Sequence, residues 1–311
     1  MTEAPVKETK QGIIVRGIAG FYYVDADGTV YQSKARGLFR KKGRTPLVGD
    51  RVSIEIQDDG DAWITEIHDR RNAFVRPPIA NVETFVLVLA AKRPDPLPLI
   101  ADRFLVMAEA KKAEAVIVIN KEDLAGEGEI AALRDVYSAV YPVYVLSATE
   151  GSGTEALKAA LAGKTVALAG PSGVGKSTIL NALIGRTVAE TGETSARLGR
   201  GKQTTRASEL YAIGEGTYVF DTPGFTSFSA VDAAGPVDEI EAMEAGLTER
   251  ELAYCFPEFA PYLGGCRFDN CLHRTEPDCR VREALTGGRI APSRYGSYRT
   301  ILEELKNRKR Y

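Results

Sequence analysis

The sequence contains few cysteines and no long apolar run. Its 311 residues include 4 cysteines, 2 histidines and 1 tryptophan. No apolar run approaches the roughly eighteen residues that a membrane-spanning helix needs, and the first residues lack the apolar core of a signal peptide. The formal net charge of −2 gives no overall attraction to nucleic acid. These absences predict a cytoplasmic protein that does not bind membranes, with any basic surface confined to part of the chain.

One short motif predicts a phosphate-binding site. Gly170–Thr178 has the sequence GPSGVGKST and follows the apolar run Thr165–Ala169, which is expected to be a buried parallel strand. The motif fits G-x-x-x-x-G-K-[ST], the P-loop. Lys176 is expected to reach the outer phosphates and Ser177 to bind Mg²⁺. The expected phosphate-binding residues are Gly170, Pro171, Ser172, Gly173, Val174, Gly175, Lys176, Ser177 and Thr178.

The N-terminal part has the pattern of a small β-barrel. Five short strands separated by turn residues are expected within residues 12–68, as in an OB-fold, whose loops often bind oligonucleotides. Between two of these strands, Lys34–Arg44 is rich in basic residues and contains Phe39, which suits either RNA phosphates or a solvated loop. Trp63 is expected to pack inside the barrel.

Farther along, strands and helices alternate. This alternation predicts a doubly wound sheet, in which ligands bind at the carboxyl ends of the strands. The expected strands are 84–91, 115–119, 143–146 and 165–169, and the expected helices are 97–112, 127–140 and 154–161.

Two further motifs at such strand ends indicate that the base is guanine. Asp123, in the motif N-K-x-D, can accept hydrogen bonds from the N1–H and 2-amino groups of guanine, which adenine lacks. Asn120 is expected to brace the loop, Lys121 to lie along the base plane, and the Ser147-Ala148 pair to offer a backbone N–H to the guanine oxygen. The expected base-binding residues are Asn120, Lys121, Glu122, Asp123, Ser147 and Ala148.

A third motif, Asp221-Thr-Pro-Gly224, fits D-x-x-G. Asp221 is expected to hold Mg²⁺ through water, and Gly224 to meet the γ-phosphate. The Gly- and Thr-rich segment 191–206 is typical of a switch loop that GTP and Mg²⁺ order. Thr205 would complete the Mg²⁺ ligands with Ser177. The expected catalytic residues are Lys176, Gln203, Thr204, Thr205 and Gly224.

The order of the motifs is permuted, because N-K-x-D precedes the P-loop, whereas in Ras-like GTPases it follows. The residue after D-x-x-G is also unusual. In Ras a glutamine there orients the attacking water, but here the residue is Phe225, which cannot form that hydrogen bond. We expect slow intrinsic hydrolysis, with the missing group supplied by the switch loop or by a partner.

The C-terminal region carries a metal-binding pattern. Cys266, Cys271, His273 and Cys279 form a Cys₃His set, which favours one closed, structural zinc site. Cys255 lies outside the set and is expected to be a small core residue. Arginines around the set suit either RNA contact or solubility.

Together these features resemble the RsgA (YjeQ/YloQ) family of small-ribosomal-subunit assembly GTPases. The resemblance rests on the barrel, the permuted motifs, the zinc set, Thr191–Ser195 and Arg294–Tyr298. It implies binding to the 30S subunit late in maturation, contact with 16S rRNA through both flanking domains, and GTP hydrolysis stimulated by the subunit. One departure is Gln203, where the family usually has a histidine that is a candidate for assisting hydrolysis.

The expected fold is therefore a multidomain α/β chain, and the expected form is a monomer. An OB-fold barrel covers 1–72, a circularly permuted P-loop GTPase domain 73–231, and a zinc-binding module 232–311. Two other functions remain open at this point. One is an rRNA-binding factor that senses GTP with negligible hydrolysis, and the other is an ATP-dependent enzyme, which would leave Asp123 unexplained.

Overall fold

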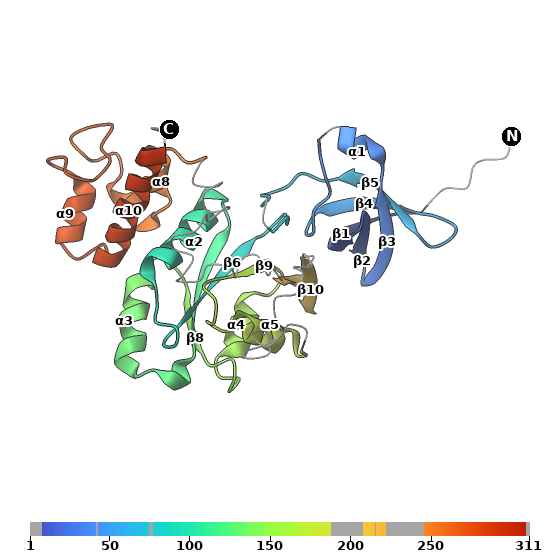
Figure 1. The fold of residues 1–311 in the computed structure, drawn as a ribbon, viewed down its shortest axis with the longest axis horizontal. Helices are drawn as coiled ribbons and strands as arrows, with labels where there is room; N and C mark the ends of the chain where they lie inside the picture. Colours follow the sequence, from blue (N-terminus) through green and yellow to red (C-terminus); the bar gives the residue numbers. More distant parts are fainter. Residues whose placement is uncertain are drawn as a thin grey trace. The chain divides into compact units, whose positions relative to one another are not determined.

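The structure, a computed structural model, describes residues 8–41, 43–74, 77–187, 208–214, 216–221 and 246–308. Figure 1 shows the helices and strands of the chain. The described residues divide into two compact units. The first contains the residues up to Glu83, Leu161–Ala167 and the described residues of 208–221. The second contains Thr84–Ala160, residues 168–187 and residues 246–308. The division into three domains ending at 72, 231 and 311 stays a prediction.

The first unit begins with a five-stranded barrel. Its strands are β1 (Thr9–Ile18), β2 (Phe21–Ala26), β3 (Thr29–Ala35), β4 (Arg51–Ile56) and β5 (Ala62–Ile67), and the short helix α1 (Gly37–Lys41) follows β3. The strand order is β2-β3-β5-β4-β1, and pairing of β1 with β2 closes the barrel. Alternate residues such as Val52 and Ile54 have no exposed surface, as expected for strands with one face on a core. The predicted OB-fold barrel is confirmed.

The expectation for Trp63 is wrong. Its side chain is 38% exposed, whereas its neighbours in β5, Ala62 and Ile64, are buried. Because side chains alternate between the two faces of a strand, only one of these two sets can occupy the barrel interior. Trp63 lies on the outer face.

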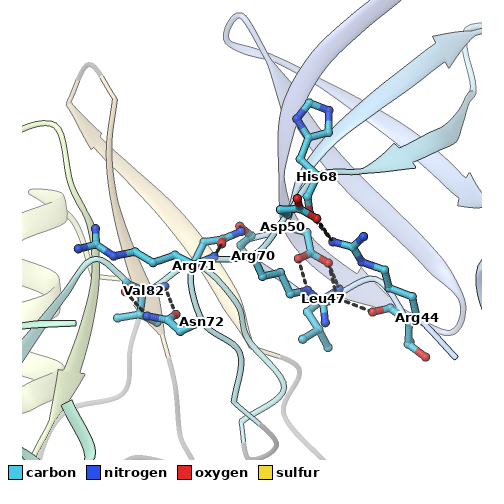
Figure 2. A network of polar contacts seen from close by, with 12 residues as sticks. Arg44, Leu47, Asp50, His68, Arg70, Arg71, Asn72 and Val82 are labelled. Carbon is cyan, nitrogen blue, oxygen red and sulfur yellow. Dashed lines mark hydrogen bonds and ion pairs between the residues drawn. The ribbon is translucent and has the colours of Figure 1, made fainter. Parts of the chain in front are cut away.

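Side-chain hydrogen bonds fasten the segment after the barrel to it (Figure 2). Arg70 donates from Nε and Nη2 to the buried carboxylate of Asp50, at 2.7 and 2.8 Å. The same Nη2 donates to the carbonyl of Thr45 at 2.6 Å. Asn72 exchanges two hydrogen bonds with the backbone of Val82, at 2.8 and 2.9 Å (Figure 2). These hydrogen bonds hold Arg70 against the barrel and Asn72 against Val82, all within the first unit.

The first unit also contains strands from later in the chain. β11 (Thr217–Asp221) pairs in parallel with β9 (Thr165–Ala169) and antiparallel with β10 (Glu209–Gly214). Asp221 is the last residue of β11.

In the second unit, parallel strands alternate with helices as expected. β6 (Thr84–Ala90), β7 (Glu114–Asn120) and β8 (Val143–Leu146) pair in that order. The intervening helices are α2 (Pro98–Ala110), the short 3₁₀ helix η1 (Glu122–Leu124), α3 (Glu127–Tyr137), α4 (Thr154–Ala160) and, after β9, α5 (Lys176–Ile184). All residues of β6 are buried, which is typical of a parallel strand covered on both faces.

The C-terminal helices complete the second unit. They are α8 (Glu249–Tyr254), the 3₁₀ helix η4 (Pro257–Tyr262), α9 (Arg280–Thr286) and α10 (Pro292–Arg308). Their core includes Phe256, Phe259, Tyr298 and the buried Cys255, and Val106 of α2 belongs to the same core. The C-terminal helices and α2 therefore share one hydrophobic cluster. Among the described residues, no helix is long and apolar enough to span a bilayer.

Candidate functional site

The loop between β9 and α5 is built around glycines at positions that exclude a side chain. Gly170 has φ of +137°, and a Cβ there would lie 2.3 Å from the carbonyl oxygen of Val88. Gly175 has φ of +98°, and a Cβ there would lie 2.2 Å from Nδ2 of Asn120. The loop can pass this close to β6 and β7 only because both residues are glycine.

The loop leaves the start of α5 open to an anion. Gly175 is the N-cap residue and has no side chain, so no side chain of the N-cap residue accepts a hydrogen bond from the N–H groups of the first turn. An anion there also gains from the positive end of the helix dipole. Ser177 and Thr178 lie half-buried in this turn, Pro171 and Val174 are buried, and Ser172 and Gly173 are exposed.

Lys176 is held inside the loop. Its side chain is buried, and its ammonium donates to the carbonyls of Gly170 at 2.8 Å and Pro171 at 2.5 Å. Burial lowers the pKa of Lys176 to about 8, because removal from water disfavours the charged form. A phosphate would restore the lost stabilisation of this charge.

Asn120, the last residue of β7, joins three loops. Its Nδ2 donates to the carbonyl of Val174 in the P-loop at 2.8 Å. Its Oδ1 accepts from the backbone N–H of Ala148, after β8, at 3.0 Å. The side chain is 3% exposed, so these hydrogen bonds are made out of water. This is the bracing role that the sequence predicts for Asn120.

The residues after Asn120 form a short turn at the carboxyl end of β7 that continues into η1. Lys121 adopts a left-handed conformation and donates from Nζ to the carbonyls of Gly173, at 2.7 Å, and Arg93. Burial lowers the pKa of Lys121. Glu122 accepts from the Ser152 hydroxyl at 2.6 Å. Asp123 is exposed, so its carboxylate is accessible to a ligand.

The backbone donors after β8 are engaged within the protein. The Ser147 N–H donates to the carbonyl of Ser152 at 3.2 Å, and the Ala148 N–H donates to Asn120. A guanine oxygen at this place would have to share the Ala148 N–H with the Asn120 side chain.

The structure does not describe every predicted site residue. Asp221 is half-buried at the end of β11, and it belongs to the first unit, whereas the P-loop and N-K-x-D belong to the second. The other predicted switch and catalytic residues, Gln203, Thr204, Thr205, Gly224 and Phe225, lie outside the described residues.

The predicted zinc ligands come together. The ligand atoms of Cys266, Cys271, His273 and Cys279 all lie within 4.8 Å of one another. The sulfurs of Cys266 and Cys279 are 3.9 Å apart, and His273 Nδ1 is 3.6 and 3.4 Å from them. A tetrahedral zinc has edges of about 3.8 Å between sulfurs and about 3.5 Å between sulfur and nitrogen. The residues fit the ion.

Two tyrosines of α10 support this cluster. Tyr295 donates its hydroxyl to the carbonyl of His273 at 2.7 Å, and Tyr298 to that of Leu272 at 2.9 Å. The sequence motif Arg294–Tyr298 thus holds the loop that carries the ligands. The surrounding arginines are partly paired with acids: Arg267 with Asp278, Arg274 with Glu303, and Arg280 with Glu283.

Sequence reasoning missed a buried charge cluster beside this module. Arg294 is 1% exposed and donates to Asp102 Oδ1 at 2.8 Å and to both oxygens of Glu258, at 2.6 and 3.0 Å. Its guanidinium also lies 4.7 Å from the Phe256 ring centre. Asp102 belongs to α2, so the ion pair ties α10 and η4 to α2 inside the second unit. A buried arginine with two carboxylates leaves no local sequence pattern.

Comparison with known proteins gives consistent matches over nearly the whole chain. The family described as RsgA GTPase matches residues 67–231, and the RsgA N-terminal domain matches residues 11–64. The chain is 45% identical to "Small ribosomal subunit biogenesis GTPase RsgA 1" of Listeria monocytogenes, over 96% of this chain and 98% of that protein. It is also 45% identical to the protein named RsgA of Geobacillus thermodenitrificans, with the same coverage.

Two solved structures are similar throughout. The crystal structure of YjeQ from Thermotoga maritima matches with a TM-score of 0.79 and 35% identity, over 96% of this chain and 99% of that one. The structure of YloQ, titled a circularly permuted GTPase, matches with a TM-score of 0.77 and 32% identity, over 99% of both chains.

Proposed function

The chain belongs to the RsgA GTPase family, and from this we propose that it hydrolyses GTP to GDP and phosphate in the biogenesis of the small ribosomal subunit. One observation supports this most directly. Asn120, at the end of β7, is hydrogen-bonded both to the P-loop and to the loop after β8. Three motifs that would bind one nucleotide are thereby joined by a single buried side chain.

Guanine would be selected by Asp123. Its exposed carboxylate would accept from the N1–H and 2-amino groups of the base. Adenine would leave that acceptor without donors. An unpaired polar group discriminates between ligands more strongly than a small difference in apolar fit does. The Lys121 stem, fixed by its hydrogen bond to Gly173, would lie along the base plane.

Phosphate binding would redirect Lys176. Its ammonium now donates to two loop carbonyls, and a phosphate oxygen could take their place. Mg²⁺, held by Ser177 and Thr205 and through water by Asp221, would neutralise charge on the phosphates during transfer. In this proposal, the remaining residues of the P-loop and of the N-K-x-D motif orient the nucleotide and exclude water.

Hydrolysis would be slow on the free chain, because Phe225 cannot orient a water molecule. Gln203 would supply that hydrogen bond when the chain is bound to the subunit, in the switch segment 191–206 that GTP orders. Gly224 and Thr204 would help hold the γ-phosphate. The rival function, a GTP-sensing factor with negligible hydrolysis, is not favoured, because the relatives are named GTPases.

The flanking parts would hold the subunit. We propose that the barrel and the module around the Cys₃His set contact 16S rRNA of the 30S subunit, and that one zinc ion stabilises this module. GTP would order the switches and set the C-terminal helices against the subunit, and hydrolysis would release them. In this proposal the protein acts in the cytoplasm, as a monomer.

The test is GTP turnover by the purified chain alone, with 30S subunits, and with 50S subunits as the control. We expect stimulation by 30S subunits only. A Lys176→Ala variant controls for contaminating GTPases and should show no stimulation. GTP binding without stimulation would overturn the proposed hydrolysis while leaving the nucleotide site in place. In a competition assay, ATP should displace GTP from the Asp123→Ala variant more readily than from the unchanged chain.

A further inference from the structure

A row of aromatic and basic side chains crosses the outer face of the barrel. In the register of the strands, Phe21 of β2 lies opposite Lys34 of β3, and Lys34 lies beside Trp63 of β5. Residues that are paired in register project on the same face of a sheet. The adjacent row, Ser33 and Ala62, is buried, so the row with Lys34 and Trp63 is the outward one.

This row forms the floor of a groove. The groove is an open cavity of about 370 Å³, in the size range of small-ligand sites. Helix α1 contributes Phe39 to it, and the loop before β4 contributes Thr45 and Pro46. It therefore combines aromatic surface from three parts of the first unit.

The charge of the groove is positive. Lys34 Nζ lies 5.2 Å from the Phe21 ring centre, and its side chain is exposed. The acid at the end of the row, Glu55 opposite Trp63, is paired with Arg36 at 3.1 Å. Arg36 is half exposed and uses one of its donors on Glu55, so others remain available to an anion.

Hydrogen bonds hold one wall of the groove, the loop before β4. Arg70 donates to the carbonyl of Thr45 at 2.6 Å. It also donates to the buried carboxylate of Asp50 (Figure 2). Asp50 also accepts from the backbone N–H of Leu47 at 2.7 Å (Figure 2). The hydrogen-bonded loop holds Thr45 and Pro46 in place, so little ordering is required when a ligand enters.

We propose that this groove binds one unstacked base of single-stranded RNA, with Trp63 as the stacking surface. Lys34 and Arg36 contact the phosphates on either side of that base. A flat aromatic side chain beside cations suits a base and its phosphates together, whereas a duplex keeps its bases stacked and out of reach. The inference rests on the proposed ribosomal function for its partner and on the groove for its chemistry.

The sole tryptophan provides a direct test, because Trp63 is the only one in the chain. The full chain is titrated with a single-stranded RNA octamer, with the same strand annealed to its complement, and with polyglutamate of equal charge. We expect saturable quenching of the tryptophan fluorescence by the single strand, and little by the duplex or by polyglutamate. Equal quenching by all three would overturn the proposal.

Variants measure the contribution of stacking. Trp63→Ala should weaken binding of the single strand, measured with labelled RNA, by about 5- to 150-fold, and Trp63→Phe should weaken it much less. Lys34→Gln should reduce the slope of log affinity against log salt by about 0.7. Val30→Ala is the matched control. Val30 is 55% exposed and lies on β3, the strand that carries Lys34, but it does not line the groove.

The RNA-binding test of the groove and the GTP-turnover test of the proposed function can fail independently. Basal GTP turnover of the Trp63 variants should equal that of the unchanged chain, because Trp63 belongs to the first unit and the P-loop to the second. If 30S subunits stimulate turnover while Trp63→Ala leaves RNA affinity unchanged, the groove proposal is wrong and the GTPase function stands. If Trp63→Ala loses RNA affinity but no subunit stimulates turnover, the groove binds RNA and the proposed function is wrong.

Discussion

Replacement of Arg294 by methionine should destabilise the second unit strongly. Arg294 and its partner Asp102 are 1% and 0% exposed, and the Glu258 side chain is 8% exposed. Methionine fills much of the space but leaves two buried carboxylates without a counter-charge. Removal of one partner from a buried ion pair costs about 3–5 kcal/mol, so we expect a loss of that size in the free energy of unfolding.

The loss should depend on pH. Burial raises the pKa of Asp102, and Arg294 opposes that rise. Without Arg294 the pKa rises further, so the folded variant binds a proton at pH values where the unfolded chain does not. Stability of the variant then falls as pH rises. The loss relative to the unchanged chain should be largest near about pH 7.5 and smaller near about pH 5.

The assay is urea unfolding followed by far-ultraviolet circular dichroism, because the long helices lie in the second unit. Trp63 fluorescence follows the first unit in the same samples and should shift less. Arg299→Met is the matched control, since Arg299 on the same helix is 48% exposed and should cost less than about 1 kcal/mol.

A triple variant isolates the charges. Arg294→Met combined with Asp102→Asn and Glu258→Gln should recover part of the loss, because no buried carboxylate remains. A cost of Arg294→Met below about 1 kcal/mol, or one independent of pH, would refute the reasoning.

Three further predictions concern the nucleotide, the metal and catalysis. Phosphate contact would raise the pKa of Lys176 from about 8. GDP affinity should therefore be constant near neutral pH and fall about fourfold by about pH 8.5. An equal fall in GDP affinity of the Lys176→Ala variant would show that other groups cause it. Purified chain should carry one zinc by elemental analysis, and Cys279→Ser, at a buried core position, should lose zinc and unfold at lower urea; unchanged zinc content would contradict the assigned ligands. Gln203→Ala should lower subunit-stimulated turnover while GTP affinity stays the same, and unchanged turnover would remove Gln203 from the mechanism.

The parts of the site that the sequence predicts are those with local patterns. Gly170 and Gly175 belong to a fixed motif next to an apolar strand, and the positive φ values explain why the motif needs them. Asn120 was expected to brace its loop, and it does so through two hydrogen bonds. Spacing also identified the four zinc-ligand candidates, because all of them lie in one short segment.

The features that were missed depend on distant or alternating residues. Arg294 meets Asp102 from a position 192 residues away in the sequence, and charged residues are ordinarily expected at the surface. Trp63 was expected inside the barrel because it is a large aromatic residue. The alternation of Ala62, Trp63 and Ile64 carried the correct signal, since the two small and aliphatic residues fill the barrel interior.

The central claim is that a guanine nucleotide controls binding to the small ribosomal subunit. The most direct measurement compares the affinity of the chain for 30S subunits when loaded with a non-hydrolysable GTP analogue and with GDP. The account predicts at least about tenfold tighter binding of the GTP-analogue form, equivalent to about 1.4 kcal/mol of coupling. Equal affinities would contradict it, because a ligand shifts an equilibrium only by its differential binding to the two states.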